Sequence, residues 1–259
     1  MTGSEFSSCL IKLRRAEEHS ELYAVERQAW IDRNPYVLSR KFDAETGRHD
    51  VVLNVVEPPP LDRWSVITGD CIHNLRSALD HAIYALAIRD SGQNPPPKGD
   101  DIQFPTVRDP KYWPNAVERR LGCFSAASQE KIEGLQPYNR PHADFPPLLS
   151  LVGHFDNIDK HRMLNIVQTQ STRTLVHFRG RPSIAGHIHE LGPVNGRTKT
   201  IYSFFTNPPN PNVQYNYNPT FEIMIPFPRG PRGDGTISVK YLLEILIAEV
   251  KTVINQLIV

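Results

Sequence analysis

Residues 69–86 read GDCIHNLRSALDHAIYAL, a stretch that combines the apolar rhythm of a helix with an unusual set of polar side chains. With a rotation of about 100° per residue, six apolar residues fall within an arc of about 100° and form one stripe. These residues are Ile72, Leu75, Leu79, Ala82, Ile83 and Leu86. The spacing therefore predicts an amphipathic helix whose stripe faces the core of a helical bundle.

The other side of this predicted helix carries polar residues but no Lys or Glu, the usual residues of a solvent-facing helix. Asp, Asn, Ser and His are mediocre helix formers that tend to make hydrogen bonds. Arg76 and Asp80 are four residues apart and can pair, whereas Arg76 and His81 do not lie one above the other. The face is a solvated surface, a functional site or a buried polar network, and its composition favours the last two. Its members are Asp70, His73, Asn74, Arg76, Ser77, Asp80, His81 and Tyr84.

A second polar cluster follows an apolar stripe in the helix that we predict over residues 147–164. One more turn of this helix places Asp159 and Arg162 on the line of the stripe, where core residues would come next. Because a buried charge must be paired, these two side chains act either as a structural clamp or as groups that orient the first cluster. Both interpretations predict that the two helices touch. The stripe consists of Leu148, Leu151, Val152, Phe155 and Ile158.

The rest of the chain adds helices and strands around these two segments. Two β-branched runs around the turn-rich DAETGRHD predict a hairpin over residues 36–56. Strand patterns separated by Gly, Asn and Pro turns predict an antiparallel sheet over residues 165–228, which the hairpin joins. The fold class is therefore α+β, a single domain over residues 1–259 with the sheet inserted into a helical bundle. Its four main helices are predicted over residues 7–33, 64–90, 147–164 and 236–258.

The composition is that of an ordinary globular protein, with 259 residues, 39% hydrophobic residues and a formal net charge of +1. A net charge near zero gives no global electrostatic signature of nucleic-acid binding. The three cysteines lie far apart with no CxxC pair, which argues against a disulfide framework or a zinc ribbon. With no signal-peptide core and no long uncharged apolar run, we expect a cytoplasmic protein without a membrane span.

Several other kinds of site were considered. No phosphate-binding loop, dinucleotide fingerprint or GxSxG element is present. The aromatic residues Tyr202, Phe204, Phe205, Tyr215 and Tyr217 either stack nucleic-acid bases or pack on their own sheet.

A metal site is a further alternative, because histidine and aspartate are common metal ligands. The helices nevertheless lack HExxH and paired HxxxH spacings, so we expect no metal and no other cofactor. The candidate ligands would be Asp70, His73, His81, His154, Asp159 and His161, and the pair His187 and His189.

The segment RSALDH, from Arg76 to His81, places an Arg and a His five positions apart on a predicted bundle helix. This arrangement resembles the HEPN superfamily, whose members are helical bundles and often metal-independent ribonucleases. The resemblance covers at most the helical part of the chain, and Ser77 stands where the family usually has Asn, Asp or His. It implies that Arg76 and His81 of two protomers line a cleft at a homodimer interface.

The chemistry that the resemblance implies is coherent. An imidazole titrates near neutrality, so His81 could move a proton to or from the RNA 2′-hydroxyl or the leaving oxygen. Arg76 could stabilise the charge of the phosphorane. The supporting residues would be His73, Ser77, Asp80, Asp159 and Arg162.

Two functions follow from these observations. The first is a HEPN-like ribonuclease or RNA-binding protein, a toxin or phage-defence component with an antitoxin-like partner. The second is a non-catalytic interaction or structural module in which the polar helix faces form a buried network.

Overall fold

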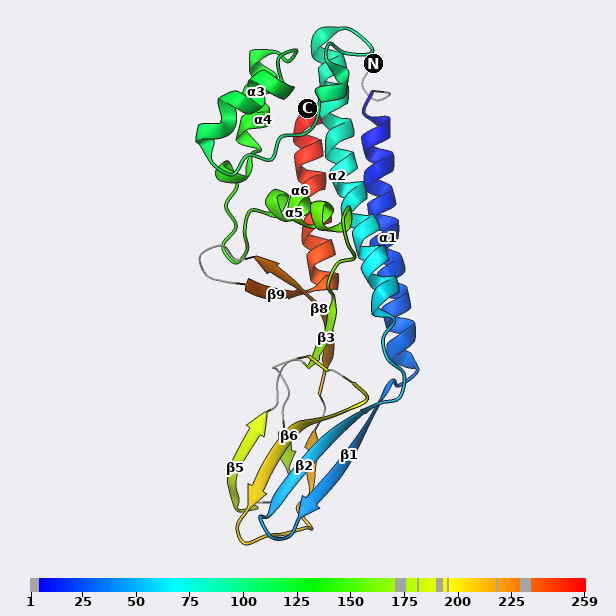
Figure 1. Ribbon diagram of the computed structural model, residues 1–259, viewed down its shortest axis with the longest axis vertical. Helices are drawn as coiled ribbons and strands as arrows, with labels where there is room; N and C mark the ends of the chain where they lie inside the picture. The colour runs from blue at the N-terminus through cyan, green and yellow to red at the C-terminus, as the bar shows by residue number, and fades with distance from the viewer. Residues whose placement is uncertain are drawn as a thin grey trace. The chain divides into compact units, whose positions relative to one another are not determined.

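The computed structural model describes residues 5–170, 176–180, 182–189, 193–194, 196–217, 219–228 and 234–259. Within these residues the chain forms long helices and antiparallel sheets, which confirms the predicted α+β class (Figure 1). It divides into two compact units. The helical unit comprises Met1–Ala24, Asp62–Asn165 and Pro226–Val259, and the β unit comprises Val25–Leu61 and Ile166–Ile225. The single domain over residues 1–259 stays a prediction.

Four helices of the described chain correspond to the four main predicted helices, and two short ones lie between the second and third of these. Asn34, in the left-handed conformation with φ of 52°, and Pro35 follow the end of α1, as expected for a helix terminus. The helices are α1 Ser7–Asp32, α2 Leu61–Ser91, α3 Trp113–Arg120, α4 Ala126–Gly134, α5 Leu148–Asp159 and α6 Val239–Ile258.

The helical unit is built around α2. All six residues of the apolar stripe predicted from residues 69–86 are buried, with at most 1% exposure. The neighbouring helices are tied to α2 by hydrogen bonds to main-chain carbonyls. Cys71 donates to Ala16 of α1 at 3.2 Å, and Arg89 donates to Ile258 of α6 at 3.0 Å. The stripe therefore faces the core, as its spacing predicts.

Three helix ends differ from the prediction by three residues or more. α2 begins at Leu61 rather than residue 64. α5 ends at Asp159 rather than near residue 164, because the chain leaves the helix in a turn at Lys160 and His161. α6 begins at Val239 rather than 236, because Asp234–Ser238 form strand β9 beside β8.

The β unit contains the predicted hairpin, and the hairpin joins the later strands as expected. One sheet has the order β1-β2-β6-β5, β3 pairs with β8, and β4 pairs with β7. Gly47, at φ +67°, turns the chain between β1 and β2, where a side chain would overlap the carbonyl oxygen of Thr206. The strands are β1 Tyr36–Asp43, β2 Arg48–Val55, β3 Val167–Gln170, β4 Val176–Phe178, β5 Ile184–His189, β6 Thr198–Thr206, β7 Tyr215–Tyr217 and β8 Phe221–Pro228.

Most of the aromatic residues considered for base stacking form the core of the β unit. Tyr202, Phe204, Tyr215 and Tyr217 are at most 5% exposed. The rings of Phe204 and Tyr215 meet edge to face with centroids 4.8 Å apart, while Tyr202 stacks on Tyr217 at 5.1 Å. These four rings contact one another, which favours the second alternative, packing on their own sheet.

Candidate functional site

The polar face of α2 contains a group of hydrogen-bonded residues that we call the Arg76 clamp, made of Arg76, Asp80, Phe104 and Thr106. The Arg76 guanidinium makes four hydrogen bonds: Nε to Asp80 Oδ2 at 3.2 Å, Nη2 to Asp80 Oδ1 at 2.9 Å, Nη2 to the Phe104 carbonyl at 2.8 Å and Nη1 to Thr106 Oγ1 at 3.1 Å. The Arg76 side chain is only 14% exposed. The predicted i,i+4 pair of Arg76 and Asp80 is therefore present, and it also binds a distant segment of the chain.

Asp80 holds the same segment from its other side. Its Oδ1 accepts a hydrogen bond from the Phe104 N–H at 2.8 Å, in addition to the contacts with Arg76. Burial raises the pKa of Asp80 above its ordinary value, against the opposing effects of Arg76 and the Phe104 N–H. Further along, the Val107 N–H donates to the buried Gln136 Oε1 at 3.0 Å. These bonds fix residues 104–107 against the helical core.

His81 lies beside the clamp, at the wall of a pocket of about 480 Å³. The side chain is half-buried. The pocket is lined on the α2 side by Asp80, His81 and Tyr84, and elsewhere by Glu5 and Asn94. Arg76 does not line it. Asp80 is therefore the residue that connects the two candidate catalytic residues, since it binds Arg76 and borders the His81 pocket.

The other end of the polar face contacts α5, as both interpretations of the second cluster predict. His73 Nδ1 and Asp156 Oδ1 are hydrogen-bonded at 2.9 Å. Lys160 Nζ lies 2.7 Å from Asp156 Oδ2. The Asp156 side chain is 5% exposed, while His73 is half exposed. The buried carboxylate is thus paired with two cationic or hydrogen-bonding partners.

Asp156 is a site residue that the sequence analysis missed. It follows Phe155 directly and comes four residues after Val152, so the helical spacing already places it at the edge of the buried stripe. The helical spacing was therefore the signal that could have identified Asp156, which comes one turn before Asp159.

Asp159 is half-buried, and its carboxylate lies against Gly69 of α2, where a side chain would overlap it. Burial raises the pKa of Asp159, and the nearby carboxylates of Asp70 and Asp156 add to this effect.

Asp159 and Arg162 would lie on one face only if the helix continued past residue 159. α5 ends at Asp159, so helical spacing no longer applies to Arg162, which lies beyond the helix and is exposed. Among the described side chains, no ion pair joins these two residues. Ser77 is half-buried on the polar face.

Neither a metal-ligand cluster nor a membrane-spanning helix is found in the residues that the structure describes. Among those side chains, no group of three or more His, Cys, Asp or Glu residues is arranged to hold a metal ion. None of the described helices combines the length and the apolarity that crossing a membrane requires.

Comparison with known proteins adds no assignment. No family model, curated protein or solved structure matches this chain.

Proposed function

We propose that the helical unit is a non-catalytic interaction or structural module, and that the polar face of α2 forms its buried polar network. The observation that carries this proposal is the set of four hydrogen bonds from the Arg76 guanidinium to Asp80, Phe104 and Thr106. An arginine that stabilises a transition state must direct N–H groups at the reacting atoms. Arg76 directs its N–H groups at its own chain, and so holds residues 104–106 against α2.

The energetics of a buried ion pair provide the test of this proposal. Removing one partner of a buried pair leaves an uncompensated charge and costs about 3 kcal/mol. We therefore expect Arg76→Ala to lower the free energy of unfolding by about 3 kcal/mol. The double variant Arg76→Ala/Asp80→Ala should lose less than the sum of the two single variants. Urea unfolding followed by circular dichroism measures both quantities.

Two further variants make this experiment decisive. Arg76→Lys keeps the charge but loses the planar fork, so it should fold with an intermediate loss if Arg76→Ala does not fold. Arg119→Ala, on an exposed position of α3, should change the free energy of unfolding by less than about 0.5 kcal/mol. Equal stabilities of the Arg76→Ala and Arg119→Ala variants would contradict the structural role.

A second candidate function is a HEPN-like, metal-independent endoribonuclease or RNA-binding protein. The observation that favours it is the position of His81 beside Asp80 at the wall of a pocket. In this proposal His81 moves the proton, and Arg76 exchanges clamp contacts for the phosphate. A second protomer of a homodimer completes the cleft. An antitoxin-like partner protein belongs to the same proposal.

Expression in bacteria separates the two candidates. A ribonuclease should arrest growth and degrade total RNA, and the purified protein should cleave RNA in the presence of EDTA. His81→Ala should abolish both effects while its unfolding midpoint stays close to that of the wild type. Intact RNA and normal growth with the wild-type protein would reject the ribonuclease and leave the structural network.

A further inference from the structure

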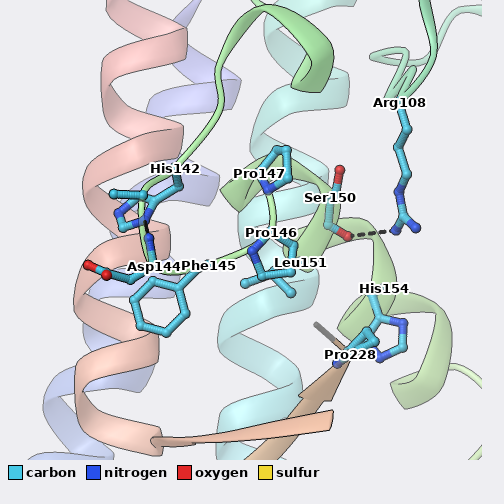
Figure 2. A pocket seen from close by; sticks show the side chains of 11 residues that line it. Arg108, His142, Asp144, Phe145, Pro146, Pro147, Ser150, Leu151, His154 and Pro228 are labelled. Atoms are coloured by element: carbon cyan, nitrogen blue, oxygen red, sulfur yellow. Dashed lines mark hydrogen bonds between the residues drawn. The ribbon is translucent and has the colours of Figure 1, made fainter. Parts of the chain in front are cut away.

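The helical unit contains a second pocket, of about 670 Å³, which Arg108 lines directly after the segment that the Arg76 clamp holds in place. Figure 2 shows its lining from four parts of the chain: Arg108, the segment from His142 to Pro147, the first turns of α5, and Pro228 at the end of β8. A volume of this size is typical of sites for small molecules. Neither candidate function of the α2 polar face uses this pocket.

Arg108 brings a positive charge with unused hydrogen-bond donors to this pocket. Its Nη2 donates to the Ser150 carbonyl at 3.3 Å, the bond drawn in Figure 2. Within the described residues, its Nε and Nη1 have no acceptor, in contrast to the engaged groups of Arg76. Arg108 also follows directly on Val107, whose N–H is bound by Gln136. The main chain that carries the Arg108 guanidinium is therefore held in place, which lowers the entropy cost of binding a ligand. Its unused N–H groups can donate to that ligand.

Two histidines line the same pocket. His154 lies on α5 one turn after Ser150, and its pKa is lowered by burial and, secondarily, by the charge of Arg108. His142 accepts a hydrogen bond from the Asp144 N–H at Nδ1, at 3.2 Å, so the proton of this ring lies at Nε2, which can donate. Both rings thus add hydrogen-bond donors to the pocket.

The main chain at the start of α5 adds to this positive character. The cap position is Pro147, which has no N–H, and no side chain caps the helix. Ser150 is 3% exposed, and its hydroxyl has no hydrogen-bond partner among the described residues. The N-terminal end of a helix carries partial positive charge and favours anions.

One carboxylate also lines the pocket, and it is distant from Arg108. Figure 2 shows Asp144 on the opposite side of the view, with Phe145 and Leu151 between the two. The wall between them is apolar and includes Pro146. The lining therefore has a cationic end near Arg108 and an apolar middle.

From this arrangement we infer that the pocket binds a small organic anion, whose phosphate or carboxylate group contacts Arg108 and His154 and whose apolar part lies against Phe145 and Leu151. A guanidinium fork fits both kinds of anionic group. The inference is independent of the function proposed for the α2 polar face, because the two sites share no side chain.

A titration of the full chain tests this inference. The probes are phenyl phosphate, benzoate and inorganic phosphate, and binding is followed by NMR chemical shifts and by calorimetry. We expect phenyl phosphate or benzoate to bind more tightly than inorganic phosphate, since only the first two have an apolar part. The tighter of the two aromatic probes identifies the anionic group.

Variants then locate the binding. Arg108→Gln should lower the affinity for the aromatic probe that binds more tightly by at least about tenfold, because a charge-assisted hydrogen bond is lost. His154→Gln should weaken it less. Arg119→Gln, which removes an exposed arginine from α3 outside this pocket, should bind as the wild type does. Arg108→Lys should be intermediate, and a thermal melt of each variant confirms that it is folded.

Two results would overturn the inference. One is the absence of binding by all three probes at millimolar concentrations. The other is equal affinity of the Arg108→Gln and Arg119→Gln variants, which would show that the anion binds elsewhere.

Discussion

Individual side chains of the α2 polar face differ in how far the sequence could predict their roles. The Arg76 and Asp80 pair was predictable because both residues lie on one helix, four positions apart. Their contacts with Phe104 and Thr106 depend on how a distant loop folds back, and no local pattern encodes that contact. The roles of single residues are therefore predictable within one helix and not across the fold.

Asp159 provides a prediction at this scale. Its pKa is raised by burial and by Asp70 and Asp156, so its charged form is less favourable in the folded than in the unfolded chain. The contribution of the Asp159 carboxyl to the free energy of unfolding is therefore largest below the pKa of this group in the unfolded chain, about 4. This contribution is lost as the pH rises through the pKa of Asp159 in the folded chain. Asp159→Asn should accordingly be more stable than the wild type at pH 7, by about 0.5 kcal/mol because the site is partly screened.

The pH dependence distinguishes this effect from a simple packing change. The advantage of Asp159→Asn should disappear as the pH falls below about 4, as measured by urea unfolding at several pH values. The control Glu130→Gln, at an exposed position of α4, should show no comparable gain. A gain of equal size at pH 3 and pH 7 would rule out the electrostatic explanation.

At the scale of elements, the contact between α2 and α5 depends on the absence of a side chain at Gly69. A Cβ at this position would overlap the Asp159 carboxylate, so the glycine leaves room for that side chain against α2. Glycine in the middle of a helix costs about 1 kcal/mol relative to alanine. The contact with Asp159 therefore requires a glycine at position 69, which has a lower helix propensity than alanine.

This requirement gives a prediction with a built-in control. Gly69→Ala should lower the free energy of unfolding by about 1–2 kcal/mol through overlap with Asp159. In an Asp159→Ala background the same change should raise it, by up to about 1 kcal/mol, because only the gain in helix propensity remains. A double-mutant cycle measured by urea unfolding would disprove the contact if the two effects of Gly69→Ala were equal.

The sequence predicted long elements better than their ends. α1 was predicted to within one residue at each end, because Pro35 follows its last turn. The prediction for α2 began three residues too late and ended one residue too early. The end of α5 was misjudged because the run after Asp159 contains neither Gly nor Pro to indicate the turn. β9 was missed because it follows a Gly- and Pro-rich run that is typical of a connector.

On the scale of the whole molecule, two units are built from interleaved segments of one chain. The α+β class was predictable from the two kinds of periodicity. The division into units was not, because it depends on which distant residues meet. Each unit has a buried core of its own, around Leu75 and Leu246 in the helical unit and around Phe204 in the β unit.

Separate cores predict separate responses to substitution. Phe204→Ala should destabilise the β unit by about 3 kcal/mol, so hydrogen exchange in β2 and β6 should accelerate by about 100-fold. Exchange in α2 and α6 should change by less than about twofold. Leu246→Ala should produce the reverse pattern. Equal acceleration in all four elements by Phe204→Ala would instead support the predicted single domain over residues 1–259.

The interleaving of segments also fixes an order of events on the ribosome. Every segment of the β unit has been synthesised once residue 225 has left the exit tunnel, whereas the helical unit still lacks α6 at that moment. The apolar side chains of α2 that pack on α6 then stay uncovered until α6 leaves the tunnel. We expect nascent chains to expose a chaperone-binding surface on α2 during this interval, and to lose it when α6 emerges.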